Sequence, residues 1–375
     1  MLRLAWSEPR LRPRLTALFV TLLIIPIYSG ITAVFYLLDE LSPSLHRVRI
    51  EKPVFVVGHA RSGTTLLHRL MVSDAERFNF FLLYELLFPS LWQKRILRGI
   101  GAIDRVLFRS FVKKRLVAAE DQALEEARDM HEIGLFIPEE DDFVLTASCV
   151  ASTWVAMFPG LPEFDVYYVD EWPKKRRRRV MRAYADGVRR QLCLSGAQRT
   201  HCSKNPSYSG RIESLIEQFP DARFVVMMRD PREAIPSLLK MLDKVWRQQG
   251  WSEARIEKSI RALIANSVHT YLYPMEVLGK HSDTKWTMVD YRELVSRADL
   301  KYDEPVSYNE EGLPVGNGTM GSIVWTSPSS LKFQINRVDV YATNSYTKSF
   351  NKRHSEYCGG TGLIDVDFVD FGEDV

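Results

Sequence analysis

PVFVVGHARSGTTLLHRLM, residues 53–71, is the stretch that decides the fold. It opens with an apolar, mostly β-branched run at 54–57, which is typical of a buried strand. A loop bounded by Gly58 and Gly63 follows, and a helical pattern begins at Thr64. The backbone N–H groups of such a loop and the positive end of the helix dipole point at the same place. A strand, a glycine-bounded loop and a helix therefore predict a cradle for a phosphate-like anion.

The loop departs from the Walker A sequence of nucleoside triphosphatases at one position. The spacing of Gly58 and Gly63 matches, but Thr64 stands where the Walker lysine should follow the second glycine. The cation lies inside the loop instead, as Arg61. Since the Walker lysine serves the β- and γ-phosphates of a triphosphate, its absence makes ATP hydrolysis the weaker interpretation. A P-loop kinase or NTPase stays an alternative, in which Asp230 would have to act as the metal-binding acid.

A second motif lies at residues 223–241, RFVVMMRDPREAIPSLLKM. An apolar strand is expected over 224–228, Arg229 follows it directly, and Ser237 comes eight residues after Arg229. A guanidinium can hold a phosphate through two charge-assisted hydrogen bonds, while a hydroxyl binds a further oxygen. The alternative is a capped turn in which Arg229 makes an ordinary ion pair. Together with the first loop, the motif predicts a nucleotide site at the carboxyl ends of the strands.

The two motifs resemble those of the sulfotransferases that use 3′-phosphoadenosine-5′-phosphosulfate (PAPS) as donor, over about residues 53–300. The resemblance implies an α/β fold, a P-loop-like three-layer sandwich with a mainly parallel sheet. It implies transfer of a sulfuryl group from PAPS to a hydroxyl or amine acceptor, without a metal. Arg229 and Ser237 would hold the 3′-phosphate. The residues implied for the 5′-phosphosulfate are Arg61, which also counts as catalytic, Ser62, Gly63, Thr64 and Thr65.

Three further residues are candidates for catalysis. Glu85 lies in the apolar segment 80–92, FFLLYELLFPSLW, which resembles the catalytic-glutamate segment of the tyrosylprotein sulfotransferases. A carboxylate in such surroundings has a raised pKa and suits a general base; the alternative is a helix-face glutamate paired with an arginine. Lys204 matches the family's lysine that assists the leaving group, and His201 is a candidate base or a structural histidine. The acidic run 138–142 predicts a helix cap, with an acceptor-site role as the alternative.

The N-terminal part predicts membrane association. Residues 1–14 contain four arginines, and residues 15–38 contain no charged residue. As a helix, this uncharged stretch would be ~36 Å long at ~1.5 Å per residue, against a hydrocarbon core of ~30 Å. A single span with a cytoplasmic N-terminus would place the catalytic domain outside, where a bacterium has no PAPS. A re-entrant or in-plane segment would keep that domain cytoplasmic, and a eukaryotic protein could face the Golgi lumen.

Composition limits the partners. The net charge is +3, and the basic run at 174–179, KKRRRR, lacks the interleaved aromatic residues of a nucleic-acid patch. We therefore expect a solvated or membrane-surface helix there and no nucleic-acid partner. The four cysteines have neither metal-ligand nor disulfide-framework spacing. The acceptor cannot be named from the sequence, because acceptor pockets of this kind are built from variable loops.

The amino-acid composition and the expected secondary structure change near residue 300. Beyond it, Gly, Asn, Ser and Thr are frequent, and strands are expected at 322–326, 331–342 and 363–371. The segment LPVGNGTMG at 313–321 resembles the start of the N-terminal β-sandwich of fucosidase-like glycoside hydrolases. We expect two truncated coding regions joined near this point, with an authentic divergent lobe as the alternative.

The expected organisation is therefore a basic segment and membrane anchor at 1–46, a C-terminally incomplete sulfotransferase domain at 47–300, and a β-rich fragment at 301–375. A non-catalytic membrane protein that keeps the fold is the third functional hypothesis. No glycosidase activity is expected from the fragment.

Overall fold

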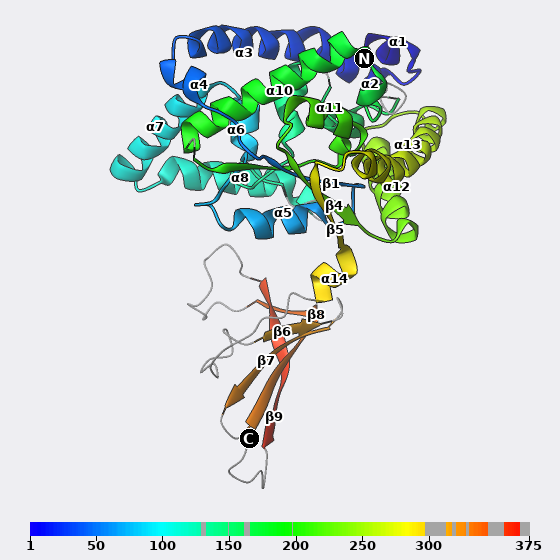
Figure 1. Ribbon diagram of the computed structural model, residues 1–375. Helices are drawn as coiled ribbons and strands as arrows, with labels where there is room; N and C mark the ends of the chain where they lie inside the picture. Colours follow the sequence, from blue (N-terminus) through cyan, green and yellow to red (C-terminus); the bar gives the residue numbers. More distant parts are fainter. Residues whose placement is uncertain are drawn as a thin grey trace. The chain divides into compact units, whose positions relative to one another are not determined.

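The computed structural model describes residues 1–128, 133–148, 150–160, 166–196 and 198–296, and four strands in the remainder of the chain. The chain divides into two compact units, Met1–Val295 and Ser296–Val375. The predicted division into an anchor, a domain and a fragment stays a prediction. Figure 1 shows both units with their elements labelled.

A five-stranded parallel sheet forms the centre of the first unit, with strand order β2-β3-β1-β4-β5. The strands are β1 Val54–Gly58, β2 Phe78–Asn79, β3 Thr200–Lys204, β4 Arg223–Met228 and β5 Lys285–Asp290. Strand β1 pairs with β3 on one side and with β4 on the other. The order of the strands reverses at β1, and ligands of open α/β sheets bind at the carboxyl ends of strands at such a point. The predicted α/β fold with a mainly parallel sheet is confirmed.

Helices cover both faces of this sheet. Side chains along β1 alternate between the two faces, and since they are apolar on both, each face has to be buried against helices. Phe55 and Val57 pack in the apolar cluster that includes residues of α10 and α11, whereas Val56 packs with residues of α5. Figure 1 shows α5 on one side of the sheet and α10 and α11 on the other. The first unit is therefore a three-layer sandwich.

The helices of the first unit have the following bounds. Before β3 they are α1 Leu2–Ser7, α2 Leu11–Phe19, the π-helical segment η1 Val20–Ile24, α3 Ile25–Asp39, α4 Pro43–Arg47, α5 Thr64–Val72, α6 Leu83–Leu87, α7 Leu91–Leu107, α8 Phe111–Arg128, the 3-10 segments η2 Asp141–Ser148 and η4 Val169–Glu171, α9 Thr153–Met157 and α10 Lys174–Ser195. After β3 they are the 3-10 segment η5 Pro206–Gly210, α11 Ile212–Gln218, α12 Pro231–Gln248, α13 Glu253–Lys280 and α14 Tyr291–Ser296.

A second core lies beside the sheet, where α1, α9, α12 and α13 meet. It is built on Trp246, Trp251, Trp154 and Phe158, and Leu4 of α1 packs into it. The segments α2, η1 and α3 run on from there as one helix, Leu11–Asp39, which is long and apolar enough to cross a membrane. The first residues of the chain are thus part of the folded unit.

The second unit contains a four-stranded antiparallel sheet of order β6-β7-β8-β9. Its strands are β6 Leu313–Gly316, β7 Met320–Ser327, β8 Ser330–Thr343 and β9 Glu356–Asp367. Strands were predicted at 322–326 and 331–342, and β7 and β8 confirm them. The third predicted strand, 363–371, begins inside β9, and its last residues lie outside the described part of the chain.

Candidate active site

The loop after β1 takes backbone conformations that bring it close to its neighbours. A Cβ atom on Gly58 (φ +136°) would lie 2.4 Å from the carbonyl oxygen of Met227, and one on Gly63 (φ +87°) would lie 2.4 Å from the ring of Tyr291. Arg61 also has a positive φ, +69°, which is uncommon for a side chain with a Cβ atom. The loop therefore passes directly into α5, and within the described chain no side chain caps that helix. Its first N–H groups and its dipole are available to an anion.

Three of the predicted anion-binding residues come together beside this helix. The Nε atom of Arg61 donates to Ser237 Oγ at 3.2 Å, and Nη1 of Arg229 donates to the carbonyl oxygen of Arg61 at 3.1 Å. The Arg229 guanidinium lies 4.6 Å from the ring centre of Tyr291 and pairs with Glu233 at 3.2 Å. Two segments more than 160 residues apart in the sequence, the loop after β1 and the end of β4 with α12, thus bring two guanidinium groups and a hydroxyl to one place.

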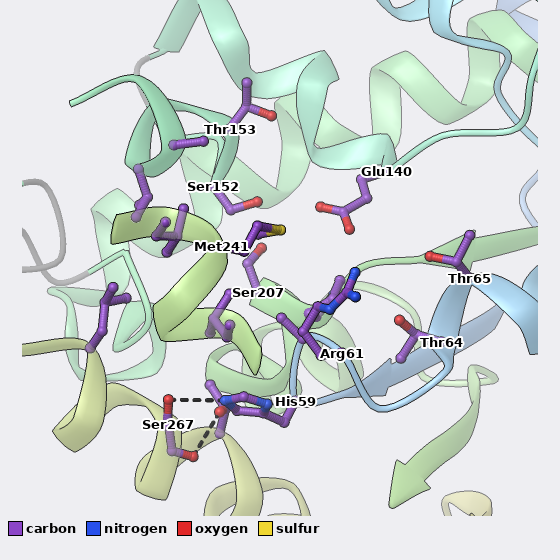
Figure 2. Close-up of a pocket in the computed structure, with 18 of the residues that line it drawn as sticks. His59, Arg61, Thr64, Thr65, Glu140, Ser152, Thr153, Ser207, Met241 and Ser267 are labelled. Atoms are coloured by element: carbon purple, nitrogen blue, oxygen red, sulfur yellow. Dashed lines mark hydrogen bonds between the residues drawn. The ribbon is translucent and has the colours of Figure 1, made fainter. Parts of the chain in front are cut away.

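A pocket of about 560 Å³ has one end beside the two guanidinium groups (Figure 2). Arg61, Thr64, Thr65 and Arg229 line that end. The opposite wall is mainly apolar and comes from α9, α12 and α13 and the segments around them. Its apolar members include Ile133, Phe143, Val155, Ala156, Leu238, Met241, Leu242, Val245 and Leu263. The pocket joins an anion-binding end to an apolar chamber.

A carboxylate lies between the two ends. Glu140 lines the pocket, and Figure 2 shows its carboxylate and the Arg61 guanidinium directed into the same space. Its Oε1 accepts a hydrogen bond of 3.2 Å from the ammonium group of Lys204, which is fully buried. Burial acts to lower the pKa of Lys204, but the carboxylates of Glu140 and Glu139 outweigh it, so the pKa is raised. Lys204 is therefore a charged lysine that holds Glu140 in place. Within the described residues it does not line the pocket, and its predicted role at the leaving group stays a prediction.

Glu85 is placed differently from its predicted role. It is buried at the start of α6, where Oε2 accepts from Leu82 N at 3.1 Å and from Gln191 Nε2 at 2.7 Å, and Oε1 accepts from Arg98 at 2.9 Å. In the described residues it is not part of the pocket lining. The geometry favours the alternative interpretation, a helix glutamate paired with an arginine, and we do not carry the role of base forward.

His201 is also enclosed in the core. Its Nε2 lies 3.1 Å from Asp141 Oδ2 and 3.3 Å from the hydroxyl of Tyr184, and its Nδ1 lies 3.2 Å from Asn79 Oδ1. Both ring nitrogens thus have partners, and the described pocket lining does not include the imidazole. This geometry favours the alternative interpretation, a buried structural histidine, and the catalytic role of His201 stays an untested prediction.

His59 and Glu140 line the pocket, and neither was assigned a role of its own from the sequence. His59 stacks on Tyr271 at 4.8 Å, and its Nε2 lies 2.9 Å from Ser267 Oγ (Figure 2). Burial lowers the pKa of His59 to about 4, so the ring is neutral near pH 7. Its place inside the glycine-bounded loop was the signal that could have marked it. Glu140 could have been found from the acidic run 138–142, for which a helix cap was the preferred interpretation.

Comparisons with known proteins agree with this geometry. The family model described as "Sulfotransferase family" matches residues 53–301. Omega-hydroxy-beta-dihydromenaquinone-9 sulfotransferase Stf3 of Mycobacterium bovis is 26% identical over 247 residues, which are 65% of this chain and 59% of the relative. The protein of that name from Mycobacterium tuberculosis gives the same values. The chain thus spans less than two thirds of the length of these relatives.

Two solved structures share the fold. Sulfotransferase STF9 from Mycobacterium avium matches with a TM-score of 0.58 at 17% identity, over 78% of this chain and 72% of that chain. Sulfotransferase STF1 from Mycobacterium tuberculosis matches with a TM-score of 0.50 at 21% identity, over 68% of this chain and 67% of that chain. At these identities the likeness concerns the fold alone.

Proposed function

Because this chain belongs to the sulfotransferase family, we propose that it transfers a sulfuryl group from PAPS to a hydroxyl group on an apolar acceptor. One observation carries the proposal: the pocket combines an anion cradle, an apolar chamber and, between them, the carboxylate of Glu140. Sulfuryl transfer needs a polyanionic donor, an acceptor and a proton acceptor at one place, and the pocket has a candidate for each.

The donor binds at the cradle. Arg61 and the N–H groups at the start of α5 hold the 5′-phosphosulfate, because a helix N-terminus and a guanidinium both favour anions. Arg229 and Ser237 hold the 3′-phosphate. Support comes from the hydrogen bonds that join Arg61 to Ser237 and Arg229 to the cradle backbone. These residues can exchange their present partners for phosphate oxygens without leaving the site.

The reaction moves one sulfuryl group and one proton. The acceptor oxygen attacks the sulfur atom, a new O–S bond forms, and the bond between sulfur and the bridging phosphate oxygen breaks. The electron pair of the broken bond stays on the phosphate, where Arg61 stabilises the negative charge. Glu140 takes the proton of the acceptor hydroxyl as general base. Lys204, which donates to Glu140 at 3.2 Å, orients this carboxylate and is a positioning residue.

The chamber selects an apolar acceptor. Its wall of aliphatic and aromatic side chains favours a ligand with apolar surface, since burying such surface is favourable by ~25 cal/mol per Å². One relative is named for a hydroxylated menaquinone. We extend that class, an apolar molecule with a hydroxyl group, to this chain, with an amine as the second acceptor chemistry.

The same proposal places the catalytic domain on the side of the membrane where PAPS is made, which is the cytoplasm in a bacterium. The N-terminal helix Leu11–Asp39 associates the protein with the membrane.

The alternative function, a P-loop kinase, gains no support from Asp230, since its carboxylate caps α12 through Arg232 N at 2.9 Å and pairs with the Arg232 side chain at 2.8 Å.

A transfer assay tests the proposal. Purified protein is incubated with PAPS labelled in the sulfate and a detergent-dispersed long-chain primary alcohol, and the labelled sulfate ester is separated by chromatography. The methyl ether of the same alcohol is the matched control, because it has no hydroxyl to sulfate. We expect label in the alcohol product alone. Phosphoryl transfer from ATP to the alcohol, with no transfer from PAPS, would overturn the proposal.

A further inference from the structure

From Thr21 onward, the helix Leu11–Asp39 carries its polar side chains on the side that faces the protein. Thr32 and Asp39 are buried, and Tyr28 and Tyr36 are partly buried on the same side. The apolar side chains point outward instead. The exposed ones include Leu15, Phe19, Leu22, Leu23, Ile27, Ile31, Val34, Leu37 and Leu38. A surface helix of a water-soluble protein shows the opposite arrangement, so this outer row, which we call the apolar row, requires an apolar environment.

The helix is fastened to the first unit at its beginning. Glu8, three residues before α2, is fully buried, and its Oε2 accepts from Arg255 Nε at 2.7 Å and from Ser252 Oγ at 3.0 Å. The side chain of Arg10 donates to the carbonyl oxygen of Trp251 at 2.9 Å. These contacts tie the start of the helix to the beginning of α13.

The end of the helix is fastened to the same unit. Asp39 is fully buried, and its Oδ2 accepts from Arg190 Nε of α10 at 2.8 Å and from Leu91 N at 2.9 Å. Its Oδ1 accepts from Ser90 Oγ at 2.8 Å. The carboxylate therefore caps α7 and forms a buried ion pair, and removing one member of such a pair is costly. In Figure 1, α3 runs along the helical layer that contains α10.

We propose that Leu11–Asp39 lies in the plane of a lipid bilayer surface, with its apolar row among the acyl chains and the whole first unit on one side. A spanning helix must place its two ends on opposite sides of the membrane. Both ends of this helix are bound through buried carboxylates to one folded unit, so spanning would require that unit to come apart. A helix with one apolar side lies flat at the interface and buries that side in lipid.

The flanks of the helix fit a bilayer surface rather than another protein. No charged residue occurs from 15 to 38, whereas the exposed Arg12 and Arg47 lie outside the two ends of this uncharged stretch and match anionic lipid headgroups. Trp6, which is 71% exposed, precedes the helix, and the exposed Trp92 donates its indole N–H to the carbonyl oxygen of Leu38 at 3.2 Å. Tryptophan is enriched at membrane–water interfaces. We therefore assign a lipid bilayer as the environment that covers the apolar row.

Cysteine labelling tests the orientation. Leu11 and Leu41, 65% and 76% exposed, flank the uncharged stretch and are each replaced by cysteine in full-length protein whose four natural cysteines are alanine. Spheroplasts and inverted membrane vesicles of a bacterial host are treated with a membrane-impermeant maleimide. We expect both positions to be labelled in inverted vesicles and neither in spheroplasts. Labelling of the two positions from opposite sides, or of neither from any side, would overturn the proposal.

Vesicle binding tests the apolar row itself. The double variant Leu22→Glu, Ile31→Glu changes two outward side chains that are 61% and 50% exposed; the control Leu272→Glu changes a leucine of α13 that is 64% exposed. Sedimentation with phosphatidylcholine vesicles containing phosphatidylglycerol gives the partition coefficient, and binding of 3′-phosphoadenosine 5′-phosphate (PAP) reports folding.

We expect at least a ten-fold loss of partitioning for the double variant and no change for Leu272→Glu. Two outcomes would contradict the assignment. A soluble wild-type dimer that the double variant converts to monomer would show that a second copy covers the row. Binding that survives the double variant and is lost in Val106→Glu would place the lipid contact at the end of α7, where Val106 is 78% exposed.

Discussion

Replacing Glu140 by glutamine shows whether its carboxylate acts as the proton acceptor or has only a structural role. Glutamine keeps the size of the side chain and can accept the hydrogen bond that Lys204 Nζ donates at 3.2 Å, but it cannot take a proton. Glu139 remains 3.9 Å from Lys204, so the buried ammonium group keeps a carboxylate nearby. A general base contributes about 10²–10⁴-fold to a rate, which corresponds to roughly 3–5 kcal/mol of barrier at ~1.36 kcal/mol per factor of ten.

We therefore expect Glu140→Gln to lower the turnover number by about 10²–10⁴-fold and to leave PAP affinity nearly unchanged. The matched control is Glu85→Gln. Glu85 holds α6 through hydrogen bonds from Leu82 N, Gln191 and Arg98, so its loss should cost roughly 1–3 kcal/mol of unfolding free energy with normal turnover in the folded protein.

Sulfate transfer from labelled PAPS gives the turnover number, and urea unfolding gives the stability of both variants. The reasoning is refuted if Glu140→Gln turns over normally, or if folded Glu85→Gln is the variant that loses turnover. A loss of PAP affinity in Glu140→Gln that accounts for the whole rate effect would also refute it, because Glu140 would then belong to the donor site.

Four other changes have defined outcomes. Arg229→Ala should weaken PAP binding in calorimetry by ~1.5–3 kcal/mol and ADP binding far less; equal losses would show that Arg229 does not contact the 3′-phosphate. Gly63→Ala should abolish PAP binding in the folded protein, because the backbone there has φ +87° and the added methyl group meets a ring at 2.4 Å; normal affinity would mean that the cradle adapts. Burial lowers the pKa of His59 to about 4 and of His68 to about 3, whereas unfolded histidine titrates near ~6.5. The contribution of these two histidines to the unfolding free energy is then at its maximum above about pH 6.5 and falls as the pH is lowered toward 4, by on the order of 2 kcal/mol per histidine at pH 5; urea titrations that give equal stability at pH 7 and pH 5 would contradict this. Limited proteolysis should first cut between about 299 and 317 and leave PAP affinity intact, and a cut that destroys binding would make the tail an integral lobe.

The anion cradle could be predicted from the sequence because its determinants are local. The spacing of Gly58 and Gly63 after a β-branched run describes a strand, a turn and a helix start within a few residues. Arg229 and Ser237 were assigned through the resemblance to the sulfotransferases, and the motif that carries it is also local, since one residue directly follows a strand and the other lies near the start of the next helix. Their meeting with Arg61 follows from the pairing of neighbouring parallel strands, β1 and β4.

The sequence could not show whether Glu85 or Glu140 is the better candidate for the general base. Glu85 and Glu140 both lie near apolar segments, and their roles depend on partners far along the chain. Gln191 of α10 reaches Glu85, and Lys204 of β3 reaches Glu140. The residues next to a glutamate in the sequence do not show whether a side chain from a distant helix or strand will bind its carboxylate. His201 was ambiguous for the same reason, because its partner Asp141 is 60 residues away.

The sequence predicted the uncharged stretch of the N-terminal helix, but it left the orientation of that helix relative to the membrane open. Composition gives the length of the uncharged stretch, and that length allows a spanning or a flat helix. The decisive residues are Glu8 and Asp39, which lie just outside the stretch and look like ordinary flanking acids in the sequence. Only the fold shows that both are buried in ion pairs with Arg255 and Arg190.

The most direct test of the central claim, that this pocket binds PAPS as its donor, is calorimetry with PAP, ADP and ATP on the same preparation of full-length protein. PAP carries the 3′-phosphate that Arg229 and Ser237 are proposed to hold. We predict that PAP binds about ten-fold or more tightly than ADP, the equivalent of one or more charge-assisted contacts, and that magnesium does not change the order. Equal affinity for PAP and ADP, or magnesium-dependent binding of ATP that exceeds both, would contradict the account.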